Sequence, residues 1–68
     1  MSKGTVKYFN ETKGWGFISS EELNQEVYVH YTAINMDGFR TLKEGQQVFY
    51  ELTKIGKGLC AQNVTPVD

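Results

Sequence analysis

Short segments in which apolar and polar residues alternate set the strongest limit on how this chain folds. The segments with the two-residue side-chain period of a β-strand are 5–10, 13–18, 27–31, 46–53 and 59–65. Turn-forming residues such as Asp37-Gly38 and Glu44-Gly45 separate them, and no segment has the 3.6-residue apolar period of a long helix. The sequence therefore predicts an all-β fold of five short strands. We expect an antiparallel barrel, because closure removes exposed sheet edges.

The chain length and its single cysteine limit the domain organisation. Sixty-eight residues allow one domain, 1–68, and a chain of this size buries only about 60 % of its unfolded surface. No apolar segment approaches the roughly 20 residues of a membrane span, and no signal peptide opens the chain. Cys60 has no partner for an internal disulfide. We expect a cytoplasmic protein without membrane association.

Segment 13–18, Lys-Gly-Trp-Gly-Phe-Ile, places two aromatic rings on one face of a strand. Trp15 and Phe17 share that face, and Gly14, Gly16 and Ile18 share the other. Glycine is a poor strand former, so two glycines between aromatic residues need a reason. Close approach of a flat ligand to the rings is one such reason.

Segment 27–31 is a second aromatic strand. Tyr28 and His30 lie on one face, and Val27 and Val29 on the other. Rings on the open face of a sheet with lysines nearby are typical of surfaces that stack the bases of a single strand. The alternative, that the rings form the core, is less favoured because valines already supply an apolar face. Lys13 is placed to hold a phosphate.

The first strand and the long connection leave two placements open. In segment 5–10, Tyr8 either caps the core or is turned outward by a β-bulge, and Phe9 lies either beneath stacked bases or in the core. Residues 32–34 predict one helical turn with Thr32 as its cap and Ile34 in the core. Leu42 is expected to be buried. Phe39 follows a turn and is expected to be exposed, with a core position as the alternative.

The overall charge argues against a protein that binds nucleic acid chiefly by electrostatics. The formal net charge is −1 and the pI is about 5.7, whereas basic domains are usual for such binders. The first twenty residues contain three lysines against Glu11, while the acidic residues concentrate in 19–26, which is expected to be a loop. Because fields are local, a cationic face remains compatible with this charge. Phosphate contacts should be few, and stacking must supply much of the affinity.

Four motifs together resemble the cold-shock domain family, above all the small bacterial cold-shock proteins. They are Gly-Thr-Val-Lys-Tyr-Phe-Asn at 4–10, Lys-Gly-Trp-Gly-Phe-Ile at 13–18, Val-Tyr-Val-His-Tyr-Thr-Ala-Ile at 27–34 and Ala-Gln-Asn-Val-Thr-Pro at 61–66. The second is similar to the family's first ribonucleoprotein motif and the third to its second. The resemblance covers essentially the whole chain.

The resemblance implies a five-stranded oligonucleotide-binding (OB-fold) barrel that binds single-stranded RNA and DNA. It also implies an RNA chaperone that influences transcription termination and translation. A monomer is expected, with a strand-swapped dimer as the alternative. The residues at the family's binding positions are Lys7, Tyr8, Lys13, Trp15, Phe17, Tyr28, His30, Tyr31, Phe39 and Lys57. Tyr8 stands where the family usually has tryptophan, and Leu59-Cys60 replaces the commoner ending of the loop before the fifth strand.

The sequence contains little that supports a catalytic or metal-binding site. His30 has no second histidine or paired cysteine near it in the sequence, so stacking or hydrogen bonding is favoured over metal ligation. No base accompanies Cys60 at a spacing that supports nucleophilic catalysis. We therefore expect no enzyme activity, cofactor or small-molecule substrate. A protein-interaction module is the alternative function, because small barrels with exposed aromatics also bind peptides.

Overall fold

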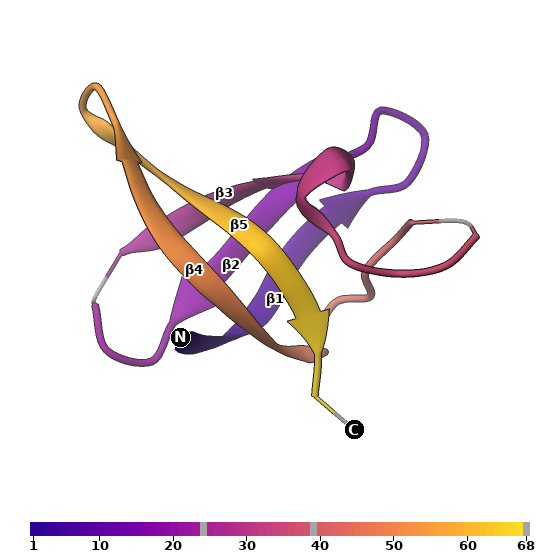
Figure 1. Cartoon of the computed structure of the whole chain (residues 1–68), viewed down its shortest axis with the longest axis horizontal. Helices are drawn as coiled ribbons and strands as arrows, with labels where there is room; N and C mark the ends of the chain where they lie inside the picture. The colour runs from indigo at the N-terminus through magenta and orange to yellow at the C-terminus, as the bar shows by residue number, and fades with distance from the viewer. Residues whose placement is uncertain (24, 39, 68) are drawn as a thin grey trace.

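The computed structural model describes residues 1–23, 25–38 and 40–67. Its elements are β1 (Ser2–Asn10), β2 (Trp15–Ser20), β3 (Glu26–His30), the single 3₁₀ turn η1 (Tyr31–Ala33), β4 (Gln47–Ile55) and β5 (Gly58–Pro66). The strands close into a barrel in the order β1-β2-β3-β5-β4 (Figure 1). Four neighbouring pairs are antiparallel, and β3 and β5 meet in a short parallel contact between Tyr28 and Cys60. The predicted fold class, an all-β five-stranded barrel, is confirmed.

The barrel interior is filled by the apolar residues that alternation assigns to one face. The buried hydrophobic residues are Val6, Phe9, Ile18, Val27, Val29, Ala33, Ile34, Leu42, Val48, Tyr50, Ala61 and Val64. Ile34 and Leu42 belong to the long connection before β4 and close the core from one end, as predicted. Ile34 also forms a parallel bridge with Val64. Burial of these side chains is the main favourable term in the stability of so small a domain.

A β-bulge in β1 settles the open placement of Tyr8 and Phe9. The register with β2 shifts between Val6, which pairs with Ile18, and Tyr8, which pairs with Phe17, and Lys7 is the extra residue. Lys7 and Tyr8 therefore both face outward, whereas Phe9 returns to the core with 8 % of its surface exposed.

Several boundaries differ from the sequence-based prediction, most clearly around β3. Glu26 was expected in the acidic loop but is the first residue of β3. Tyr31 was expected to end that strand but begins η1. The cap of η1 is His30, whose side chain accepts a hydrogen bond from the Thr32 N–H, so the prediction of Thr32 as the cap is wrong. The His30 imidazole, two residues before Thr32, reaches this N–H. Histidine is not among the residues usually preferred at the N-cap, so the sequence did not indicate it.

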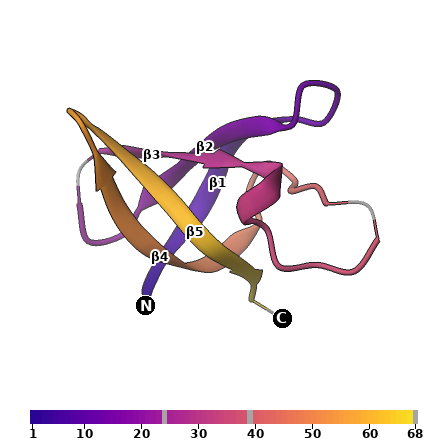
Figure 2. The same cartoon turned by 45° about the horizontal axis from the view of Figure 1, so that its top comes forward.

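The two ends of the barrel carry different connections. The β1–β2 turn, η1 and the long connection before β4 gather at one end, and the β2–β3 and β4–β5 connections lie at the other (Figures 1 and 2). The three strands β1, β2 and β3 run between these ends. Their outer face is therefore bordered by loops on two sides.

Tyr50 fills the core of β4 but leaves its hydroxyl without a partner. The register with β5 shifts between Phe49 and Glu51, and Tyr50 at this irregularity is completely buried. No hydrogen-bond partner reaches its buried oxygen among the described residues. An unsatisfied buried hydroxyl costs about 1–3 kcal/mol.

We expect Tyr50→Phe to stabilise the barrel by about 1 kcal/mol, because it removes this unsatisfied hydroxyl and keeps the ring. In a domain of this size, that gain corresponds to a rise in Tm of about 4–8 °C in thermal unfolding followed by circular dichroism. Tyr31→Phe is the matched control, because Tyr31 is 44 % exposed at the surface, so removal of its hydroxyl should leave Tm nearly unchanged. A lower Tm for Tyr50→Phe would contradict this account of the core.

Candidate nucleic-acid interface

A row of aromatic side chains crosses the outer face of β1, β2 and β3. In the register, Tyr8 pairs with Phe17 and Phe17 pairs with Tyr28, while Trp15 pairs with His30. Paired residues of a sheet project from the same face, so strand pairing brings these five rings together. Tyr8 is 41 % exposed, and the other four side chains are partly exposed. We call the outer surface formed by Tyr8, Trp15, Phe17, Tyr28 and His30 the aromatic face.

Neighbouring rings of the aromatic face contact one another edge to face. The ring centroids of Tyr8 and Trp15 are 5.9 Å apart, as are those of Trp15 and Phe17, and those of Phe17 and Tyr28 are 6.0 Å apart. The interplanar angles are 62°, 82° and 71°. Because none of these pairs is stacked face to face, the rings retain aromatic surface for a planar ligand.

Thr32 fixes the orientation of His30 at the end of this face. The backbone N–H of Thr32 donates to His30 Nδ1 at 3.4 Å, and Thr32 Oγ1 lies 2.9 Å from the same nitrogen. The Tyr31 ring lies 4.7 Å from the His30 ring at 39°. This places Tyr31, which is 44 % exposed, beside the aromatic face.

The glycines of the Lys-Gly-Trp-Gly-Phe segment accommodate the protein itself. A Cβ on Gly16 would lie 2.1 Å from the Tyr8 carbonyl oxygen and 2.7 Å from the Phe9 Cα. Gly14 lies in the turn before β2 with φ of +79°, and a Cβ there would lie 2.6 Å from a Tyr31 ring carbon. Contacts within the protein are therefore sufficient to require glycine at both positions. The two glycines admit the β1 backbone and the Tyr31 ring.

Asn10 holds the turn that leads into β2. Its side-chain oxygen accepts from the Lys13 N–H at 2.9 Å, and its carbonyl accepts from the Gly14 N–H at 2.7 Å. Its side-chain amide donates to the Tyr8 hydroxyl at 3.3 Å. The Gly14 carbonyl then accepts from the Tyr31 N–H at 2.8 Å, which joins this turn to η1. Asn10 thus supports both Tyr8 and the position of Tyr31, a role that sequence analysis missed.

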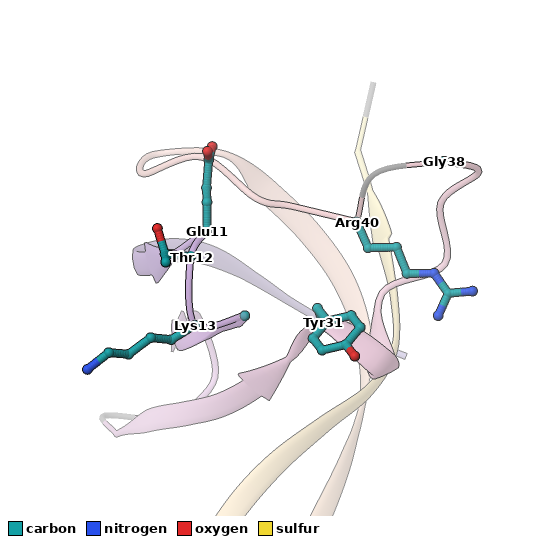
Figure 3. Close-up of a pocket in the computed structure, with 7 residues that line it drawn as sticks. Glu11, Thr12, Lys13, Tyr31, Gly38 and Arg40 are labelled. Carbon is teal, nitrogen blue, oxygen red and sulfur yellow. The ribbon is translucent and has the colours of Figure 1, made fainter.

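A groove of ≈ 560 Å³ extends the aromatic face between the β1–β2 turn and the long connection. Tyr31 lies in its middle, and Lys13 and Arg40 extend away from it on opposite sides (Figure 3). Its lining residues are Glu11, Thr12, Lys13, Gly14, Tyr31, Gly38 and Arg40. Phe39, predicted to stack a base, lies outside the described residues.

The predicted cations are distributed around the aromatic face. Lys13 lies in the β1–β2 turn, and Lys57 lies in the β4–β5 turn at the opposite end of the barrel (Figures 1 and 2). Lys7, on the β1 bulge, forms a salt bridge with Glu26 of β3. Glu26 was expected in the acidic loop 19–26, so this contact was not predicted. Alternation could have placed Glu26 correctly. It lies two residues before Tyr28 and four before His30, and residues at this spacing share one face of a strand.

Comparison with known proteins places this barrel in a family. The model of the 'cold-shock' DNA-binding domain matches residues 2–67. The cold shock-like protein CspA of Stigmatella aurantiaca is 55 % identical over 67 residues, with 98 % of each chain covered. This chain belongs to the cold-shock domain family. CspE of Escherichia coli is 53 % identical over 91 % of this chain and 90 % of its own, and CspD of Vibrio cholerae is 48 % identical over 100 % and 90 %.

Membership of the cold-shock domain family confirms the resemblance seen in the four motifs. It also confirms the expectation that the protein is not an enzyme, because the family consists of non-enzymatic nucleic-acid-binding proteins. Within residues 1–23, 25–38 and 40–67, no cluster of three metal-ligating side chains occurs. In the same ranges, no helix is long and apolar enough to span a membrane.

We expect Gly16→Ala to destabilise this cold-shock domain by about 3 kcal/mol or more, because the new methyl group overlaps the β1 backbone, which cannot move aside cheaply. Urea unfolding followed by Trp15 fluorescence measures the change. Gly58→Ala is the control. A Cβ on Gly58 would meet only the Ile55 carbonyl oxygen, at 3.7 Å, so stability should change by less than about 0.5 kcal/mol. Equal stability of the two variants would show that β1 and β2 are not in close contact.

Proposed function

We propose that this protein binds single-stranded RNA and DNA by stacking successive bases on the aromatic face, with little dependence on sequence. The observation that carries the proposal is the row of Tyr8, Trp15, Phe17 and Tyr28, which lies outward while aliphatic residues of the same strands fill the core. Such a row offers π-surface to any base. The proposed binding residues are Lys7, Tyr8, Lys13, Trp15, Phe17, Tyr28, His30, Tyr31, Phe39 and Lys57.

The charge distribution supports a mechanism in which stacking dominates. The net charge is −1, and the cations that border the aromatic face are few and spaced at its two ends and one edge. A few lysines can follow a sugar–phosphate backbone but supply a limited electrostatic contribution. Each stacked base is worth about 1–3 kcal/mol, so four or five rings provide the larger share.

This binding mode implies a preference for unpaired strands. Bases must be splayed out to reach the rings, and a duplex keeps them stacked on one another. A protein that captures unpaired bases without strong sequence preference opposes the re-formation of RNA hairpins. We therefore propose that this protein is a cytoplasmic, monomeric RNA chaperone that influences transcription termination or translation. The match to the model of the 'cold-shock' DNA-binding domain supports the nucleic-acid-binding part of this proposal.

Phe17→Ala and Tyr28→Ala should each weaken binding to oligo(dT) by about 1–3 kcal/mol, because each removes one stacking ring. Both side chains point outward, so the barrel should remain folded. A titration of the intrinsic Trp15 fluorescence measures the affinity, and thermal unfolding measures the stability.

The matched controls are Val27→Ala and Val29→Ala, which alter the inner face of the same strand. They should lower Tm and leave the affinity of the folded protein unchanged. A DNA hairpin stem with the same number of phosphates should bind much more weakly than oligo(dT). Equal affinity for the stem, or binding of peptides but not of oligo(dT), would contradict the proposed function.

A further inference from the structure

An ion pair spans β2 at the edge of the aromatic face. Lys7 projects outward because it follows the inward Val6 in β1, and Glu26 projects outward because it shares the face of Tyr28 and His30. Their side chains form a salt bridge above β2, although β1 and β3 are not neighbours in the barrel. The β2 residue that pairs with Glu26 is Ser19, whose small side chain leaves room for the two longer ones.

We propose that Glu26 is an internal counter-ion that competes with the phosphates of a bound strand for Lys7. The inference rests on the proposed function and assigns a regulatory role within that site. Lys7 lies beside Tyr8 at the edge of the aromatic face, within reach of the backbone of a strand stacked on the rings. Glu26 occupies its ammonium group in the unbound protein.

Because both side chains of the pair are exposed, the Glu26 carboxylate and a phosphate of the strand can compete for Lys7 on similar terms. The Lys7 side chain is 61 % exposed and that of Glu26 is 45 % exposed. Exposed ion pairs contribute little to stability, so a phosphate can displace the carboxylate. The displaced Glu26 then stays close to the strand, two residues before Tyr28, as an uncompensated like charge. The gain from a phosphate on Lys7 is therefore largely offset.

The consequence is a binding face that depends less on electrostatics than its lysines suggest. Each phosphate neutralised on a single strand releases counter-ions and adds about −0.7 to the slope of log affinity against log salt concentration. A lysine that exchanges one carboxylate for a phosphate contributes almost no net release. Glu26 thus adjusts the salt dependence of binding without contacting a base.

The test compares Glu26→Gln with the unmodified protein in oligo(dT) titrations across a series of salt concentrations. Neutral glutamine should free Lys7, so the slope should steepen by about 0.7. The affinity at low salt should rise about two- to fivefold. Adding Lys7→Gln to Glu26→Gln should restore the original slope. Glu26→Thr, which suits a strand, repeats the test should the glutamine variant be poorly folded.

Glu51→Gln is the matched control for net charge. Glu51 lies on β4, across the barrel from the aromatic face, where its Oε1 accepts from Asn63 Nδ2 at 2.8 Å. The slope of log affinity against log salt concentration for Glu51→Gln should equal that of the unmodified protein. An equal steepening in Glu51→Gln, an unchanged slope in Glu26→Gln, or weaker binding by Glu26→Gln would overturn the inference while the proposed function stands. Failure of the unmodified protein to bind oligo(dT) would overturn both.

Discussion

One extra residue in β1 determines which aromatic side chain of that strand faces outward and which fills the core. Without the bulge at Lys7, strict alternation would leave Tyr8 in the interior beside Val6 and turn Phe9 toward solvent. With it, Tyr8 joins Trp15 and Phe17 on the outer surface, and Phe9 fills the core. Lys7, the extra residue of the bulge, follows the inward Val6 and forms the ion pair with Glu26. The place of Tyr8 in the aromatic row therefore depends on a single irregularity of the backbone.

Close backbone contact keeps the two faces of the sheet distinct. Gly16 lies against the β1 backbone at the position where any side chain would overlap it, and this contact holds β1 and β2 together just after the bulge. Outward rings on such a sheet lose little conformational freedom when a ligand binds, because their backbone is already fixed by pairing on both sides. The core and the proposed binding face thus use alternate residues of the same strands, and each can be altered with limited effect on the other.

Alternation along the chain was sufficient to predict the strands, the barrel and the inward valines of β3. It also predicted the outward positions of Trp15, Phe17, Tyr28 and His30. It could not decide the placement of Tyr8, because a bulge changes the parity of a strand without leaving a residue signature. The role of Gly16 was also missed, since it depends on contact with β1, a separate strand. The cap formed by His30 was missed because an imidazole is an unusual capping group. Membership of the cold-shock domain family agrees with the fold, while the roles of single residues in binding rest on the geometry described here.

The central claim is that base stacking, and not phosphate binding, provides most of the affinity for a single strand. The most direct measurement compares oligo(dT) with an abasic oligodeoxynucleotide of the same length, which has the same phosphates and no bases. Competition against labelled oligo(dT) at fixed salt gives both affinities. The account predicts that the abasic strand competes at least about thirtyfold less well, because two or more stacked bases at about 1–3 kcal/mol each are lost. Competition by the abasic strand within a few-fold of oligo(dT) would contradict it.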